Sequence, residues 1–459
     1  MESLNTRRSF LKKSLYGSLG LSAFTTTQLT LVNSALAQQI VTPGDYKALV
    51  CIFLYGGNDS FNMFTPMEGQ ALVDYQDTRQ SLARTNAMEI TSQQQSIEGG
   101  VGFVPEMAAM KNLYDQGKLA IQANVGSLLR PTSVTEIINK QALLPNQLYS
   151  HSSQQHTWQR GAELNQNQTG HTGWAGRMFD LMQPNPRNTD QQFPYLQNIS
   201  LSGHNIWQSG LWTSPYSVSS TEVETMNIYK FHHLANIRKP IVENYVNNTV
   251  HEHLLAKEYS KILVGAEKNA RELNTELAQQ PLLSTSFPSN SLSDQLQQVA
   301  QLMRIGKQQG LGRQVFFVGM GGFDTHSNQS SQHPKLLAQL SDSMASFYNA
   351  TLELSMEHEV TSFTMSDFGR TLTSNGDGTD HGWGGHQFIL GGAVKGEIYG
   401  TMPRHSVGAE EDIGTGHIMP TTATEQMFAS LANWYGVNEN MLEELFPNLK
   451  NFDSYPNYF

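Results

Sequence analysis

Cysteine is nearly absent from this sequence, which has one, Cys51, among 459 residues. A disulfide framework within the chain is therefore excluded, and stability has to come from the size of the hydrophobic core. With 38% hydrophobic residues, the chain is long enough for such a core in one large domain or two ordinary ones. Long apolar runs are lacking as well. After the N-terminal region no run approaches 18 residues, so we expect no transmembrane segment in the mature chain.

Positive charge is also scarce. The chain has 29 basic and 40 acidic residues and a net charge of −11. Residues 1–37 have the features of a targeting segment, and without them 25 basic and 39 acidic residues remain, a net charge of −14. An acidic protein of this kind gains nothing from counterion release on DNA or RNA. We therefore expect no nucleic-acid partner.

The N-terminal region has the layout of a twin-arginine export signal. Arg7 and Arg8 are followed by a weakly apolar stretch and then by Ala-Leu-Ala at 35–37, a small-x-small cleavage pattern. We expect residues 1–37 to be a signal peptide that the twin-arginine translocase reads. The mature chain, 38–459, is then a single domain that works in the periplasm or is otherwise exported.

Apolar runs and amphipathic segments alternate along the rest of the chain. The runs that end at glycine or polar residues are typical of strands buried on both faces: 46–55, 118–125, 314–320, 360–365 and 388–390. Helical apolar stripes occupy 291–303, 336–348 and 422–434. The order predicts an α/β fold with a doubly wound, largely parallel sheet and helices on both faces. The stretch 220–280 has no strand candidate and is predicted to be a helical insertion.

Carboxylates and imidazoles follow these strands: Asp59, Asp324, His326, Asp367, Asp380, His381 and His386. If the strands that precede Asp59, Asp324 and Asp367 are parallel, their ends meet at the edge of the sheet where ligands bind. Asp and His together are ligands for Zn²⁺, Mn²⁺ or Fe, so the pattern predicts a divalent metal site, with zinc or manganese favoured. For Asp59 alone a turn or a helix cap is the favoured alternative, and Asp380 is the weakest candidate.

A second candidate feature is the polar segment 150–158, which is predicted to begin a helix. A hydroxyl at a helix N-terminus lies at the positive end of the helix dipole, which makes Ser150 and Ser152 candidate nucleophiles. The alternative is that Ser150 only caps the helix and that His151 packs. Arg370 is a candidate for binding an anion through two hydrogen bonds, with a solvated surface arginine as the alternative.

The chain resembles the bacterial family called domain of unknown function 1501 across nearly the whole mature sequence. Besides the signal, the resemblance rests on Leu54-Tyr55-Gly56-Gly57-Asn58-Asp59, Ser150-His151, Gly322-Phe323-Asp324-Thr325-His326, Ser366-Asp367-Phe368-Gly369-Arg370-Thr371, and Asp380-His381-Gly382 through Gly392-Ala393-Val394-Lys395-Gly396. That family is grouped with the alkaline-phosphatase and sulfatase superfamily, whose members cleave phosphate or sulfate esters at a bimetal site.

The resemblance implies a metal-dependent hydrolase that acts on a small anionic ester. It implies metal ligation by Asp59, Asp324, His326, Asp367 and His381, and a nucleophile at Ser150 or Ser152. The sequence departs from the superfamily pattern at three places. One residue separates Asp324 from His326 instead of three, and Phe368 follows Asp367 where a histidine is usual. His386 is the candidate replacement for that histidine. The serine segment also has no motif that singles out one hydroxyl. A one-metal site remains open, as does a non-catalytic exported binding or assembly protein with a degenerate site.

Overall fold

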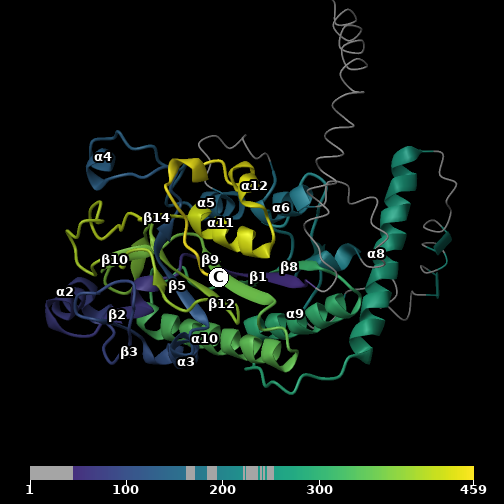
Figure 1. Ribbon diagram of the computed structural model, residues 1–459, viewed down its shortest axis with the longest axis horizontal. Coiled ribbons are helices and arrows are strands. Elements are labelled where there is room, and N and C mark those ends of the chain that lie inside the picture. Colours follow the sequence, from purple (N-terminus) through teal and green to yellow (C-terminus); the bar gives the residue numbers. More distant parts are fainter. Residues whose placement is uncertain are drawn as a thin grey trace, which may run out of the picture.

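The computed structural model describes residues 45–161, 171–182, 194–220 and 253–459, with residues 223, 236–237, 240 and 243–244 between them (Figure 1). The predicted signal peptide and its cleavage site lie outside the described residues, as does most of the first half of the predicted insertion. In the part of the chain that the structure describes, no helix is long and apolar enough to cross a membrane.

A nine-stranded sheet runs through the described residues. Its order is β13 (Ile398–Tyr399), β5 (Leu119–Gly126), β12 (Gly385–Gly391), β9 (Val360–Ser366), β1 (Lys47–Leu54), β8 (Arg313–Met320), β6 (Asn198–Ser200) and β7 (Tyr216–Ser217), with β14 (Thr422–Ala423) also paired to β5. Only β12 is antiparallel to its neighbours, and the other pairs are parallel. The five predicted strands are β1, β5, β8, β9 and β12, so the predicted α/β fold with a mostly parallel sheet is confirmed.

Strand β1 shows why this sheet needs continuous apolar runs. Successive side chains point to opposite faces of a sheet. Ala48, Val50 and Ile52 accordingly join one hydrophobic core, whereas Leu49 and Cys51 join a second one. All of β1 after Lys47 is buried, because both faces of the sheet are covered by helices.

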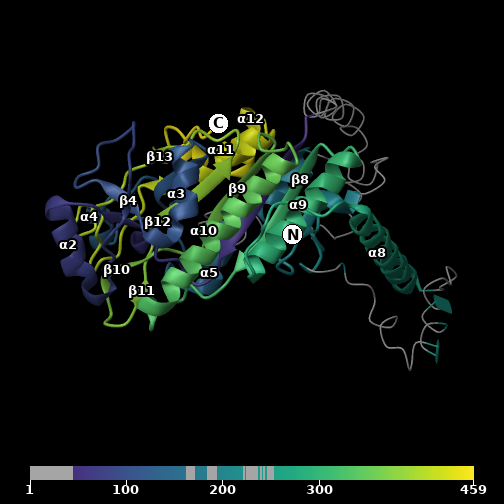
Figure 2. The ribbon, with the colours of Figure 1, turned by 90° about the horizontal axis from the view of Figure 1, so that it is seen from below.

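Helices cover each face of the sheet (Figures 1 and 2). On one face lie α3 (Ala108–Asp115), α9 (Ser291–Gln308) and α10 (Gln329–Glu353), and on the other α5 (His151–Arg160), α6 (Trp174–Met182), α11 (Thr424–Tyr435) and α12 (Glu439–Leu445). The helices predicted at 291–303, 336–348 and 422–434 are α9, α10 and α11. Helix α8 (Leu254–Gln279), the described part of the predicted insertion, contacts α9 and extends away from the sheet.

Smaller elements lie beside the main sheet. One is a three-stranded antiparallel sheet of β2 (Phe64–Pro66), β4 (Val101–Phe103) and β3 (Met88–Ile90), and another is the pair β10 (Arg370–Ser374) and β11 (Thr379–His381). The remaining elements are α2 (Gly69–Arg79), α4 (Val134–Ile138), η1 (Ser60–Asn62), η2 (Gln80–Leu82), η3 (Pro105–Met107), η5 (Pro194–Gln197) and η7 (Leu449–Asn451).

The loop after β1 brings three strand ends together. Leu54 pairs with Met320 of β8 and with Ser366 of β9, and both pairings are parallel. The next residues, Gly56 and Gly57, have φ angles of +116° and +79°. A Cβ on Gly56 would lie 2.3 Å from a backbone nitrogen of the loop after β8, so only glycine permits this approach. The predicted parallel arrangement of the strands that precede Asp59, Asp324 and Asp367 is thereby confirmed.

Candidate metal centre

Three imidazoles surround the carboxylate of Asp324 at this edge of the sheet. The Nε2 atom of His151 lies 3.4 Å from Asp324 Oδ2, and the Nε2 atoms of His326 and His381 lie 3.1 and 3.4 Å from Oδ1. His151, Asp324 and His381 each offer one ligand atom, and these atoms all lie within 4.8 Å of one another. We call His151, Asp324, His326 and His381 the histidine cluster.

The far nitrogen of each ring has an acceptor. Nδ1 of His151 lies 2.6 Å from Asp367 Oδ2, Nδ1 of His381 lies 2.7 Å from the carbonyl oxygen of Tyr149, and Nδ1 of His326 lies 3.2 Å from Asp380 Oδ1. A carbonyl or carboxylate oxygen accepts hydrogen bonds, so these Nδ1 atoms donate. In a neutral ring the lone pair is then on Nε2, the atom that faces Asp324.

The ligand atoms of His151, Asp324 and His381 are close enough together for one ion to bind all three. The Nε2 atoms of His326 and His381 are 2.9 Å apart, so without a metal ion a proton lies between them. Nitrogen ligands lie about 2.0–2.1 Å from zinc, so tetrahedral ligands are roughly 3.3 Å apart. The distances between Asp324 and the three imidazoles, 3.1–3.4 Å, are of this size. The donor set therefore fits one divalent ion, and the share of imidazole favours zinc.

Arg370 holds Asp324 in its ionised form. Burial raises the pKa of Asp324, but the hydrogen bond and the charge of Arg370 outweigh it, so the pKa lies below its ordinary value. Arg370 Nη1 lies 2.8 Å from Asp324 Oδ1, and its other hydrogen bonds reach Thr379 and the carbonyl of Gly56. Because the guanidinium is fully buried and each of its nitrogens already has a protein acceptor, it is not placed to bind a free anion.

Asp367 lies behind His151. Its Oδ2 accepts from His151, from Gln155 Nε2 at 3.0 Å and from the backbone N–H of Gly56 at 3.2 Å. Burial raises the pKa of Asp367 above its ordinary value, although these three hydrogen bonds act against it. A carboxylate that accepts from the far nitrogen of a ligating histidine is common around metal ions, where it fixes the ring. Asp367 thus orients His151 through Oδ2, whereas its Oδ1 is buried without a hydrogen-bond partner within the described residues.

Two predicted ligands, Asp59 and His386, make their hydrogen bonds with residues outside the cluster. Both oxygens of Asp59 are bound by Arg79, at 2.7 and 2.8 Å, and Gln329 adds a third hydrogen bond. His386 is buried, its Nδ1 accepts from the backbone N–H of Asn124 at 3.0 Å, and burial lowers its pKa to about 3. Asp59 is used in a buried ion pair and His386 in the packing of the interior, so we leave both out of the proposed ligand set.

The candidate serines lie beside the cluster. Ser150 directly precedes α5, between the carbonyl group that binds His381 and the ring of His151. Its Oγ lies 3.3 Å from the Oγ of Ser152 and makes no capping hydrogen bond. Neither serine has a hydrogen bond to the cluster within the described residues. Ser150 is half-buried and Ser152 is exposed.

His151 is the member of the cluster whose role could not be predicted from the sequence. The sequence favours packing for this histidine, yet it contacts Asp324 and Asp367 and its ring lies 4.4 Å from that of His381, centroid to centroid. Its partners are between 173 and 230 positions further along the chain, so no local spacing points to it. The one available signal was a histidine at the predicted start of a polar helix.

Comparisons with known proteins give a family and a loose structural likeness. The family model described as Protein of unknown function (DUF1501) matches residues 46–441. One similar solved structure is the PsFucS1 sulfatase from Pseudoalteromonas sp., with 8% identity, a TM-score of 0.33, and coverage of 89% of this chain and 72% of that one. Another is the lipoteichoic acid synthase LtaP from Listeria monocytogenes, with 6% identity, a TM-score of 0.34, and coverage of 91% and 81%. Likeness at this level carries no argument about activity. No curated protein matches the chain significantly.

Proposed function

The chain belongs to the DUF1501 family, and from its histidine cluster we propose that it is a metal-dependent hydrolase of phosphate or sulfate esters. The observation that carries the proposal is the convergence of imidazole Nε2 atoms on Asp324, each with its Nδ1 atom held by an acceptor. That the ester is a phosphate or a sulfate follows from the family resemblance. The predicted export signal supports a site of action in the periplasm.

Three residues are proposed to hold the ion: His151, Asp324 and His381. Three protein ligands leave one coordination position free, which is the arrangement of catalytic rather than structural zinc sites. The ion, zinc or manganese, would supply Lewis acidity that polarises the ester. Arg370 keeps Asp324 ionised, and Asp367 fixes the ring of His151.

His326 is proposed to transfer a proton. It is exposed to solvent, its Nε2 faces the cluster, and Asp380 accepts from its Nδ1. Burial raises the pKa of Asp380, but the hydrogen bonds from Asn375 and His326 outweigh it and the pKa lies below its ordinary value. This carboxylate holds the ring through Nδ1 and leaves Nε2 facing the cluster, the orientation that a proton-transfer residue requires. Ser150, next to His151 in the chain, remains the preferred hydroxyl nucleophile, with Ser152 as the alternative.

The test is hydrolysis of p-nitrophenyl phosphate and p-nitrophenyl sulfate by metal-depleted protein to which zinc or manganese is returned. We expect metal-dependent turnover in the wild type that falls at least 100-fold in Asp324→Asn. The exposed Asp453 provides the matched control, Asp453→Asn, which should retain full activity. The proposal would be contradicted if the turnover rate neither rose on addition of metal nor fell in Asp324→Asn.

One observation favours a second candidate function. Arg370 and Asp59, which would bind an anion and a second metal ion, are both engaged inside the protein. A non-catalytic exported binding or assembly protein that retains one metal ion would have this arrangement. Zinc bound at the cluster without hydrolysis of either ester would support it.

A further inference from the structure

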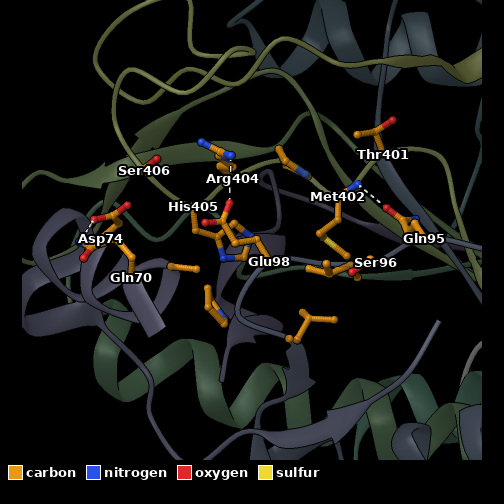
Figure 3. Close-up of a pocket in the computed structure, with 16 residues that line it drawn as sticks. Gln70, Asp74, Gln95, Ser96, Glu98, Thr401, Met402, Arg404, His405 and Ser406 are labelled. Atoms are coloured by element: carbon orange, nitrogen blue, oxygen red, sulfur yellow. Dashed lines mark hydrogen bonds and ion pairs between the residues drawn. The ribbon is translucent and has the colours of Figure 1, made fainter. Parts of the chain in front are cut away.

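A cavity of about 360 Å³ lies beside the small sheet of β2, β4 and β3 and shares no residue with the histidine cluster. Its walls come from the start of α2, from the segment 95–101 and from the segment 401–406 (Figure 3). This volume is at the lower end of the range for small-molecule sites, about 300–1,000 Å³. The cavity is therefore large enough for a small organic molecule.

The charges around the cavity sum to −1. Two carboxylates line it, Asp74 and Glu98, and Arg404 is the one arginine or lysine among its lining residues in the described chain. Arg404 Nη2 lies 2.9 Å from Glu98 Oε2, so this cation is already paired. Asp74 accepts a hydrogen bond of 2.7 Å from the neutral amide of Gln70 and has no cation opposite it in the cavity. A ligand that carries one positive charge would neutralise this carboxylate, whereas an anion would be repelled.

An unpaired imidazole lies in the wall of the same cavity. His405 is only 5% exposed, and neither of its ring nitrogens has a hydrogen-bond partner within the described residues. It packs edge-on against Phe61, at 5.5 Å between ring centroids, and against Tyr75. Burial, and then the charges of His386 and Arg79, hold its pKa well below the ordinary value, so the ring is neutral. Both nitrogens are closed off from solvent, so the ring offers the cavity neither a donor nor an acceptor and adds no charge to its wall.

The rest of the lining is apolar. Pro66, Ile97, Val101 and Met402 face the cavity together with these polar groups. The ligand should therefore have an apolar body as well as a charged end. We propose that the cavity binds a small organic monocation, a primary amine with an apolar body, whose ammonium group pairs with Asp74.

The test uses three probes of nearly the same shape that differ in the charge of one end: 3-phenylpropylamine, 3-phenylpropanol and 3-phenylpropionate. Their dissociation constants are measured by titration with saturation-transfer NMR on the purified protein at pH 7. We expect the amine to bind about fivefold more tightly than the alcohol, and the acid more weakly than both, because a partly exposed ion pair adds up to about that factor. Asp74→Asn should remove the preference for the amine.

Asp77→Asn is the matched control, because Asp77 lies on the same helix, is exposed and does not line the cavity. This variant should bind the amine like the wild type. Three equal affinities, tightest binding of the acid, no binding of any probe, or an Asp74→Asn variant that still prefers the amine would each overturn the proposal.

Discussion

The different roles of Asp324, Asp367 and Asp59 predict three different responses to zinc. Loss of the carboxylate behind a ligating histidine lowers metal affinity by about 10- to 100-fold. Zinc at 100 times the wild-type dissociation constant stabilises the folded state by about 2.7 kcal/mol, but a variant with 100-fold weaker affinity gains only about 0.4 kcal/mol. A mature chain of this length has an unfolding entropy of roughly 0.9 kcal/mol per kelvin. Zinc should thus raise the melting temperature by about 3 °C in the wild type and about 0.5 °C in Asp367→Asn.

The assay is thermal unfolding of metal-depleted protein with and without zinc. Asp324→Asn, which removes a proposed ligand, should show no zinc-induced shift. Asp59→Asn should show the full shift of about 3 °C, although it unfolds at a lower temperature without metal, because Arg79 loses its buried partner at a cost of about 3–5 kcal/mol. If Asp367→Asn keeps the wild-type shift, or if Asp59→Asn loses it, our assignment of these carboxylates is refuted.

Three further predictions concern proton transfer, acid stability and export. His326→Gln should keep its zinc, measured by metal analysis, while its ester hydrolysis falls at least tenfold; loss of the metal would show that His326 is a ligand instead. Burial lowers the pKa of His333 from 6.5 to about 4, so below pH 6.5 the unfolded chain binds a proton that the folded chain does not. The free energy of unfolding should therefore fall by up to about 3 kcal/mol between pH 6.5 and 4, and denaturant titrations of His333→Gln should lack this part of the loss. Replacement of Arg7 and Arg8 by lysine should leave precursor in the cytoplasm, and undiminished mature protein in the periplasm would contradict the export prediction.

The strands could be predicted because a strand that is buried on both faces consists of consecutive apolar residues, which the sequence shows directly. Strand β1 has to be apolar on both faces, and the glycines at 56 and 57 mark where it ends. The site could be predicted only in part, because a carboxylate after a strand looks the same in the sequence whether it faces a metal ion or an arginine. Arg79, which binds Asp59, comes from a helix 20 residues further along the chain, and nothing at Asp59 itself indicates that contact.

Only those members of the histidine cluster that follow strands could be predicted from the sequence. Asp324 and His326 follow β8 directly, and His381 ends β11, so reasoning from strand ends found them. His151 opens a helix and meets Asp324 only through the tertiary fold. Only the hydrogen bonds of the folded protein show the role of His151. The same hydrogen bonds show that Asp367, a predicted ligand, orients the imidazole of His151.

X-ray absorption at the zinc edge, recorded on zinc-loaded wild type and His381→Gln, tests the central claim most directly. The account predicts nitrogen and oxygen ligands at about 2.0–2.1 Å with the scattering of two imidazoles in the wild type, and of one in the variant. Zinc coordination without imidazole, or a spectrum that His381→Gln leaves unchanged, would contradict it.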